Sequence, residues 1–279
     1  MEEDGSGRPT ASSAPNVVAL SATDGAFHAP DTINAGWTTF RFTNQGADIH
    51  YAHFVQLDSG RTVPELVAAY AEAIRTSGPR PKWVTRFGGP GGVAPGDSSA
   101  VTQYLAPGSY VLICPVEDLG GRPHFGKGEF RTLVVLPAGP DAPGRDAAPT
   151  ATVSIRLLDF SFNLERPLTV GEQTIRVVNA GVEPHDLVLL KLAPGITAEA
   201  VVRAMNPERA RRSGAAAAPP PSLASLASIA GGIAVIRPGM EVFFTATLSP
   251  GEYLILCMTT APDGRSHIEH GMVQQVRVQ

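Results

Sequence analysis

The chain repeats itself, and this duplication restricts its possible folds more than any other feature. The segment NQGADIH at 44–50 matches NAGVEPH at 179–185, and PGDSSAVTQYLAPGSYVLIC at 95–114 matches PGMEVFFTATLSPGEYLILC at 238–257. The first pair is offset by 135 residues and the second by 143, which indicates an insertion in the second copy. We place it in the Ala- and Pro-rich stretch 215–230 and expect a surface loop there. Matches in the same order indicate that both halves share one fold.

The two copies are expected to be two domains. At 279 residues with 43% hydrophobic content, the chain can bury two separate cores. The segment PAGPDAPGRDAAPT at 137–150 is rich in Pro, Gly and Ala and is typical of a linker. We therefore predict a disordered leader at 1–15, a first domain at 16–136 and a second domain at 151–279.

Short apolar stretches separated by turn residues predict an all-β fold. Gly occurs 29 times and Pro 25 times, and the runs between them suit strands better than long helices. Apolar runs at 37–42 and 174–178 are each followed by Asn and Gly, and Pro-Gly pairs precede the apolar runs at 110–114 and 253–257. Several short strands per copy indicate β-sandwiches.

One short inserted helix is expected in each copy. In the first copy Thr62 and Glu65 have the spacing of a capping box, and apolar residues recur at helical spacing after them. Thr197 is expected to begin the helix of the second copy.

The overall charge and the apolar segments exclude some functions. The net charge is -4 with a pI near 6.0, and no basic run is present that would neutralise a row of phosphates, so nucleic acid is not an expected partner. No stretch approaches the roughly 20 apolar residues of a membrane span, and residues 1–14 do not resemble a signal peptide. The two cysteines cannot form a disulfide framework, and a Cys114–Cys257 bond would need two strand ends of separate sandwiches within about 7 Å.

Each copy ends in the same pattern of side chains that can bind a metal. A Cys closes an apolar strand, a His follows after nine residues, and a further ligand-type residue follows after four more. Another His lies upstream, after an Asn-x-Gly turn in each copy. The candidate metal ligands are His50, Cys114, His124 and Glu129 in the first copy and His185, Cys257, His267 and Met272 in the second.

The residue types in this pattern suit copper. Two imidazoles, one thiolate and a weak axial thioether form a site that accommodates both Cu(I) and Cu(II). Glu129, which stands where Met272 stands in the second copy, is a harder ligand that would lower the potential or favour another metal. A buried Cys by itself is more often a small core residue, so a metal-free core remains an alternative.

The spacing of these residues predicts how they meet. We expect Cys257 to end an inner strand, the following loop to turn back at one pole of the sandwich, and His185 to come from a neighbouring strand. The strand YLIL at 253–256 would then shield the sulfur, and His267 would provide an exposed edge for electrons to leave. His270 competes with His267 as a ligand, but only His267 has a counterpart in the first copy, which is His124.

Two other histidines are not expected to be ligands. His53 lies three residues after His50 and would point to the opposite face of a strand, so it is interpreted as structural or surface. His28 has no partner in the second copy and is interpreted as surface.

The stretch PHDLVLL at 184–190, together with CMTTAPDGRSHIEHGMVQQVRV at 257–278, resembles the plastocyanin-like cupredoxin pattern. Each of the two copies shows this likeness, and together they make up nearly the whole chain. It implies tandem Greek-key cupredoxin sandwiches, type 1 blue copper chemistry with electron transfer through the second domain, and an extracytoplasmic location, periplasmic or secreted. The Cys-to-His gap is longer than in small plastocyanins and resembles that of two-domain copper nitrite reductases. The chain is also similar to bacterial cupredoxin-like proteins with a Cys, Asp-Gly, Pro-His, Gly-Met loop.

An enzyme is the less favoured interpretation. The resemblance extends to two-domain nitrite reductases and small laccases. If this chain were such an enzyme, it would need additional histidines for a catalytic copper, one of them directly before the type 1 Cys. Ile113 and Leu256 occupy those positions here, and no His-x-His pair occurs. We therefore expect a copper protein that transfers electrons to or from a redox protein partner. The alternatives are a copper carrier or storage module, a metal-free sandwich used for binding or assembly and, less favoured, a two-domain copper oxidoreductase. The oligomeric state is left open.

Overall fold

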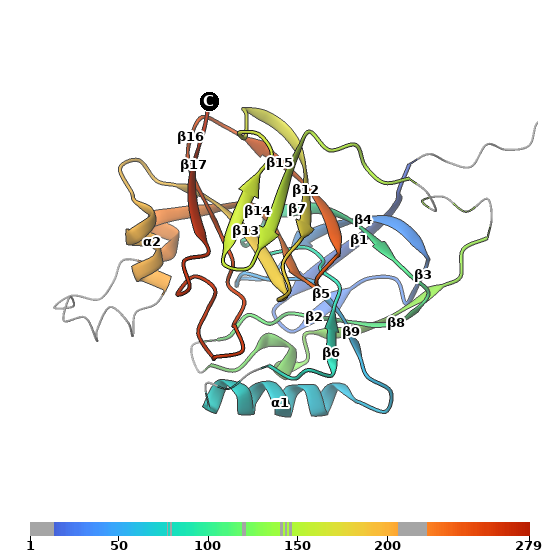
Figure 1. Ribbon diagram of the computed structural model, residues 1–279. Coiled ribbons are helices and arrows are strands. Elements are labelled where there is room, and N and C mark those ends of the chain that lie inside the picture. Colours follow the sequence, from blue (N-terminus) through green and yellow to red (C-terminus); the bar gives the residue numbers. More distant parts are fainter. Residues whose placement is uncertain are drawn as a thin grey trace, which may run out of the picture.

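The computed structural model contains two β-sandwiches that lie side by side and share one sheet (Figure 1). The structure describes residues 14–76, 78, 80–118, 121–139, 142, 144, 147–205 and 222–279. The predicted leader falls almost entirely outside the described residues, as does the 215–221 part of the predicted loop. No helix among the described residues is long and apolar enough to span a membrane.

The first sandwich packs the half-sheet β2-β1-β4-β7 against the five-stranded sheet β3-β9-β8-β5-β6. In β4, buried residues alternate with partly exposed ones, whereas the last four residues of β8 are all buried. The strands are β1 (Asn16–Thr23), β2 (Ala26–His28), β3 (Thr32–Asn34), β4 (Gly36–Asn44), β5 (His53–Leu57), β6 (Val84–Arg86), β7 (Ser98–Leu105), β8 (Gly108–Ile113) and β9 (Phe130–Leu136).

The second sandwich repeats this arrangement. The half-sheet β15-β12-β10-β11 packs against the four-stranded sheet β14-β13-β16-β17, and the apolar core between them includes Ile155, Val177 and Phe244. The strands are β10 (Val153–Leu158), β11 (Ser161–Leu164), β12 (Gly171–Asn179), β13 (His185–Leu192), β14 (Ala227–Ile236), β15 (Glu241–Leu248), β16 (Gly251–Leu256) and β17 (Val273–Val278). The prediction of an all-β protein made of sandwiches is confirmed.

The two sandwiches are joined by pairing between equivalent strands. β7 and β15 pair antiparallel and unite both half-sheets into one eight-stranded sheet. Val101 pairs with Phe244 in this register, and these residues correspond at the repeat offset of 143. An antiparallel contact in which equivalent residues face each other places a local two-fold axis at that pair.

A second contact lies on the same axis. Residues 87–91 of the first domain pair with β14 of the second, and Pro90 forms a bridge with its own equivalent, Ile233. Gly89 and Gly232, which also correspond, have φ values of 116° and 144°, a region that favours glycine. A Cβ at either position would collide with a backbone carbonyl, of Ala52 or of Leu187 respectively. Glycine is therefore required for each segment to pack against Ala52 or Leu187 of its own domain.

Helices lie outside the sandwiches. The predicted first helix is α1 (Val63–Thr76), and its capping box forms as expected, with the Thr62 N–H donating to Glu65 at 2.8 Å. The second domain contains α2 (Ala198–Met205), which follows Thr197, and a short α4 (Leu223–Leu226). The prediction of a surface loop is wrong for residues 223–230, which form α4 and the start of β14. The Ala-rich composition gave no sign of the edge strand β14, which pairs with β13.

Candidate metal centres

Equivalent elements place the candidate ligands at one end of each sandwich. β8 and β16 end one residue before Cys114 and Cys257, and both sulfurs are fully buried. His185 is the first residue of β13, and its equivalent His50 forms an isolated bridge with Val93. The loop after each Cys folds back, so strand and loop residues far apart in the sequence converge.

In the second domain, three predicted ligands meet in one buried cluster. The Cys257 Sγ lies 3.3 Å from the His267 Nδ1 and 3.8 Å from the His185 Nδ1, and the two Nδ1 atoms are 3.0 Å apart. All three side chains are 0% exposed. Both imidazoles therefore present the same nitrogen towards the sulfur, which is the arrangement that a shared metal requires.

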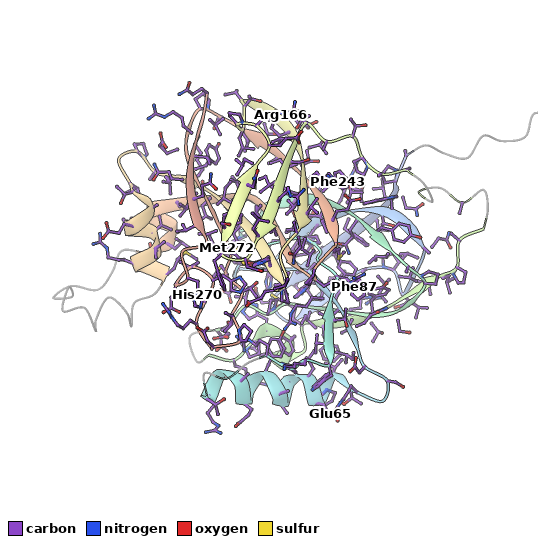
Figure 2. The ribbon with its side chains drawn as sticks, viewed as in Figure 1. Glu65, Phe87, Arg166, Phe243, His270 and Met272 are labelled. Carbon is purple, nitrogen blue, oxygen red and sulfur yellow. The ribbon has the colours of Figure 1, made fainter. Side chains whose placement is uncertain are left out.

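Met272 is held beside this cluster by the backbone. The Cys257 N–H donates to the Met272 carbonyl at 3.2 Å, and the Met272 N–H donates to the His267 carbonyl at 2.8 Å. Its side chain is fully buried in the core that contains Cys257. His270 is not part of the cluster: its Nε2 lies 3.2 Å from an Asp263 oxygen, and it stands on the loop before Met272 (Figure 2).

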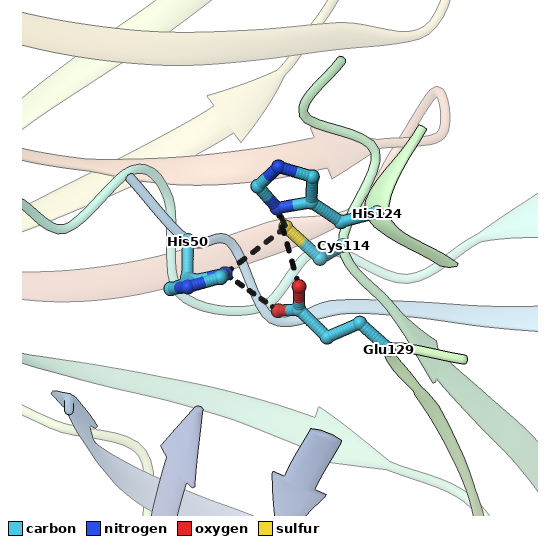
Figure 3. A group of neighbouring side chains, drawn as sticks. All are labelled: His50, Cys114, His124 and Glu129. Carbon is cyan, nitrogen blue, oxygen red and sulfur yellow. Dashed lines mark hydrogen bonds and ion pairs between the residues drawn. The ribbon is translucent and has the colours of Figure 1, made fainter. Parts of the chain in front are cut away.

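In the first domain, all four predicted ligands meet. The Cys114 Sγ lies 3.6 Å from the His124 Nδ1 and 3.8 Å from the His50 Nδ1. The Glu129 carboxylate reaches both imidazoles, at 2.7 Å from the His50 Nδ1 and 3.2 Å from the His124 Nδ1 (Figure 3). Their ligand atoms all lie within 4.8 Å of one another.

The carboxylate of Glu129 fits a metal-binding role. Glu129 is 0% exposed, and neither of its oxygens has a hydrogen-bonding partner among the described residues, despite the short distances to His50 and His124. A buried carboxylate without hydrogen bonds is costly unless a positive charge compensates it. Donor atoms that approach closely without hydrogen-bond geometry point towards a common centre, and the donor set of two imidazoles, a thiolate and a carboxylate suits a divalent metal.

Two aspartates that sequence reasoning missed support the strand histidines. The Asp159 Oδ1 lies 3.1 Å from the His185 Nε2, and the Asp24 Oδ1 lies 3.0 Å from the His50 Nε2. Each Asp is 26 residues before its His and one is the repeat equivalent of the other, so the duplication carried a signal that would have found them. Such a carboxylate fixes the tautomer that leaves Nδ1 free to bind a metal.

The loop histidines have a second pair of equivalent carboxylates. The Glu183 Oε2 lies 3.1 Å from the His267 Nε2, and the Asp48 Oδ2 lies 3.8 Å from the His124 Nε2. Phe160 also covers His267, with an edge-to-face contact at 5.2 Å between ring centroids. The prediction that His267 provides an exposed edge is therefore wrong, because a carboxylate and an aromatic ring shield it from solvent.

Burial sets the protonation of the second cluster. Burial raises the pKa of the Cys257 thiol well above its usual range, and the Asp186 carboxylate adds to this effect. Burial also lowers the pKa of His185, and burial together with His185 lowers the pKa of His267. Without metal, the cluster thus holds neutral imidazoles and a protonated thiol at neutral pH, which avoids burying charge.

The first cluster differs because it contains a carboxylate. Burial alone would lower the pKa of His50, but the carboxylates of Glu129 and Asp24 outweigh burial and raise it. Burial raises the pKa of Cys114, and Glu129 raises it further. The raised pKa favours the protonated form of His50 beside these carboxylates when no metal is present.

The two histidines that were not expected to be ligands lie outside both clusters. His53 is buried, and its Nε2 donates to the Val235 carbonyl of the other domain at 3.1 Å; burial lowers its pKa to about 3. His28 is exposed, as predicted. Both cysteines are free, so they do not form the disulfide that the sequence disfavoured.

The comparisons with known proteins concern the fold. No protein-family model and no curated protein matches the chain. Among solved structures, the "blue" copper protein auracyanin A from Chloroflexus aurantiacus is 24% identical, covers 44% of this chain and 99% of its own, and has a TM-score of 0.32. Reduced auracyanin from Roseiflexus castenholzii is 20% identical, with coverages of 44% and 99% and a TM-score of 0.30. A blue copper oxidase from Nitrosomonas europaea is 15% identical, with coverages of 95% and 86% and a TM-score of 0.26.

Each half of the chain thus has two packed sheets with a Cys at the end of an inner strand, a His from the neighbouring strand or bridge, and a second His from the returning loop. The chain is built from two β-sandwiches, each with a buried His/Cys/His cluster.

Proposed function

We propose that this protein binds copper and transfers electrons through a type 1 site in the second domain. The observation that carries this proposal is the convergence of the His185 Nδ1, the His267 Nδ1 and the Cys257 Sγ within 4.8 Å of one another, fully buried, with Met272 beside them. Copper at such a site supplies a one-electron couple whose potential is tuned by the axial ligand and by the shielding of the sulfur.

The protein's own residues prepare this site for metal. Asp159 and Glu183 each accept a hydrogen bond from an imidazole Nε2, which directs the free Nδ1 lone pairs inwards. Residues 253–256 are buried and exclude water from the sulfur. A preformed and dry set of ligands limits rearrangement between oxidation states, as electron transfer requires.

The first domain is proposed as a second metal site of different character. Glu129 occupies the position of Met272 and brings a buried carboxylate to within 2.7 Å of a ligand nitrogen. An anionic oxygen stabilises Cu(II) over Cu(I), so a copper held there would have a lower potential than one in the second domain. The same oxygen would also accept a harder divalent metal.

Electron transfer is proposed in preference to catalysis. The positions directly before the two cysteines are Ile113 and Leu256, which are fully buried apolar side chains that cannot hold a further metal.

Met258, next to Cys257 in the chain, is 46% exposed and is the nearest solvent-exposed side chain along the chain from the thiol. We propose that a redox protein partner docks near Met258 rather than over the shielded His267. An extracytoplasmic location, periplasmic or secreted, belongs to the same proposal and follows from the resemblance of the closing motif.

A copper titration of the metal-free protein tests this function. Absorption and electron paramagnetic resonance spectra would be recorded for the wild type and for Cys114→Ala and Cys257→Ala. We expect an intense visible band that is lost in Cys257→Ala and retained in Cys114→Ala. A reversible redox titration of that band would distinguish electron transfer from storage. The absence of both a band and stoichiometric uptake would contradict copper binding and leave a metal-free binding module.

A further inference from the structure

Four basic side chains gather in one pocket between the two domains. The pocket has a volume of about 340 Å³, and its lining includes Arg80, Lys82, Arg86 and Arg237. The first three belong to the first domain, in β6 or just before it, whereas Arg237 follows β14 of the second domain. The pocket therefore exists only because the two domains are held together.

Three of these cations have no counter-ion in the part of the chain that the structure describes. Among the described residues, no carboxylate lies within ion-pair distance of Lys82, Arg86 or Arg237. The guanidinium of Arg86 donates only to the carbonyl of its own strand neighbour Val84, at 3.4 Å. Arg237 lies over the Phe87 ring, 5.3 Å from its centroid. These contacts leave their N–H groups available to a ligand.

The fourth cation is incompletely satisfied. One Arg80 nitrogen lies 3.7 Å from a Glu117 oxygen, while Nη1 is buried without a hydrogen-bond partner. The acidic groups near the four cations are Glu117 beside Arg80, Glu183 at the pocket wall, and Asp186, which lines the adjoining cavity together with Arg80 and Arg86, so the cations outnumber the carboxylates by one. This surplus occurs in a chain whose net charge is -4.

We propose that this pocket is a binding site for a small oxyanion such as phosphate or sulfate. Arginine presents planar pairs of N–H groups that match the oxygens of phosphate, sulfate or carboxylate groups. The pocket volume admits such an anion, and the hydroxyls of Thr85, Thr259 and Thr260 in its lining can add neutral donors. The excess of positive charge favours an anionic ligand over a neutral one.

The pocket adjoins the second metal cluster. Its wall includes residues 259–262, which lie in the loop between Cys257 and His267, and Glu183, which accepts a hydrogen bond from the His267 Nε2 at 3.1 Å. A bound anion would add negative charge next to Glu183 and would stabilise an oxidised metal centre over a reduced one. This coupling rests on the proposed function, whereas anion binding itself does not.

The site is tested on the metal-free protein, with inorganic phosphate as the probe. Calorimetric titrations would be made at constant ionic strength, with chloride replaced by phosphate or by sulfate. We expect saturable binding at a stoichiometry of one and a melting temperature raised by about 3 °C at tenfold excess over Kd. In Lys82→Gln/Arg86→Gln/Arg237→Gln, phosphate binding should weaken by about tenfold or more.

The control is a charge-matched variant, Arg41→Gln/Arg156→Gln/Arg166→Gln, whose side chains are exposed and do not line the pocket. Circular dichroism would establish folding, and the exposed single variants Lys82→Gln and Arg237→Gln replace the triple variant if it does not fold. Absence of saturable phosphate binding, or equal loss in the control, would overturn the proposal. Sulfate titrated into copper-loaded protein then tests the coupling: we expect a lower reduction potential in the wild type only, and an unchanged potential despite binding would refute the coupling.

Discussion

The Asp159 Oδ1 lies 3.1 Å from the Nε2 of His185, whose other ring nitrogen faces Cys257 and His267. This contact joins a partly buried carboxylate just after β10 to the buried His185 at the start of β13. The same relationship occurs between Asp24 and His50 in the first domain. Both domains have thus kept the aspartate contact to the strand histidine together with the His/Cys/His cluster.

Replacing Asp159 should weaken the second site without unfolding the domain. In Asp159→Asn the amide still accepts a hydrogen bond but no longer makes the imidazole more basic, so copper affinity should fall about 10-fold to 100-fold. Competition titration against a chelator measures this change. Glu165→Gln, at a surface pair with Arg166, is the control and should bind copper normally. Equal affinities in both variants would show that Asp159 does not support the site.

Gly181 should be needed for the same contact. A Cβ at this position would clash with the Asp159 carboxylate and come within 3.0 Å of the His185 Nε2. Gly181→Ala should therefore displace Asp159 and reduce copper affinity about as much as Asp159→Asn does. Gly139→Ala, where a Cβ would meet nothing within 4 Å, is the matched control. If the double variant with Asp159→Asn lost twice the binding free energy of either single variant, the two effects would be independent and this explanation wrong.

Copper affinity should rise with pH in a way that differs between the domains. Burial raises the pKa of Cys257 and lowers those of His185 and His267, so at neutral pH copper displaces one proton, from the thiol. In Cys114→Ala the affinity should increase about tenfold per pH unit around pH 7.

In the first domain, copper affinity should depend more steeply on pH below the pKa of His50. The pKa of His50 is raised, so copper there displaces a second proton as the pH falls. In Cys257→Ala the slope should approach about a hundredfold per pH unit on the acid side. Affinities measured by competition across pH 5.5–8 check both slopes, and parallel curves for the two single-site variants would contradict the assigned protonation states.

The convergence of the candidate ligands could be predicted from the sequence because the repeat constrained their positions. Cys114 and Cys257, with their histidines, could be aligned by spacing alone, and strand alternation indicated sandwiches. The burial of His267 could not be predicted in this way. It depends on Phe160 and Glu183, which reach the loop from other elements, and spacing along the chain gives no measure of such long-range coverage.

The position of the domains relative to each other was also beyond sequence reasoning. The stretch 215–230 was interpreted by composition as a loop, yet Ala227 already belongs to the strand that contacts the other domain. A linker is usually expected to leave domains independent. Here the Gly144 carbonyl accepts a hydrogen bond from the Trp37 N–H at 2.7 Å, so part of the predicted linker packs along β4.

Exchanging the residue types of Glu129 and Met272 should shift the reduction potentials of the two sites in opposite directions. In a Cys257→Ala background, Glu129→Met removes a buried carboxylate and supplies a thioether, so the reduction potential of copper in the first domain should rise. Met272→Glu in a Cys114→Ala background should lower the potential of the second site. Redox titration followed by absorption measures both changes. Shifts in the same direction would show that these side chains do not act as axial ligands.

The shared sheet should make the two domains unfold together. Phe244 is 2% exposed, packs in the second core and pairs with Val101 across the domain boundary. Phe244→Ala should lower the free energy of unfolding by about 3–5 kcal/mol, because the cavity lies at the junction. Phe130→Ala, at a side chain 39% exposed, is the control and should cost much less. Denaturation of metal-free protein followed by both tryptophan fluorescence and circular dichroism should give coincident single transitions for the wild type. Two separated transitions would show that each sandwich is stable alone, and that the pairing of β7 with β15 contributes little to stability.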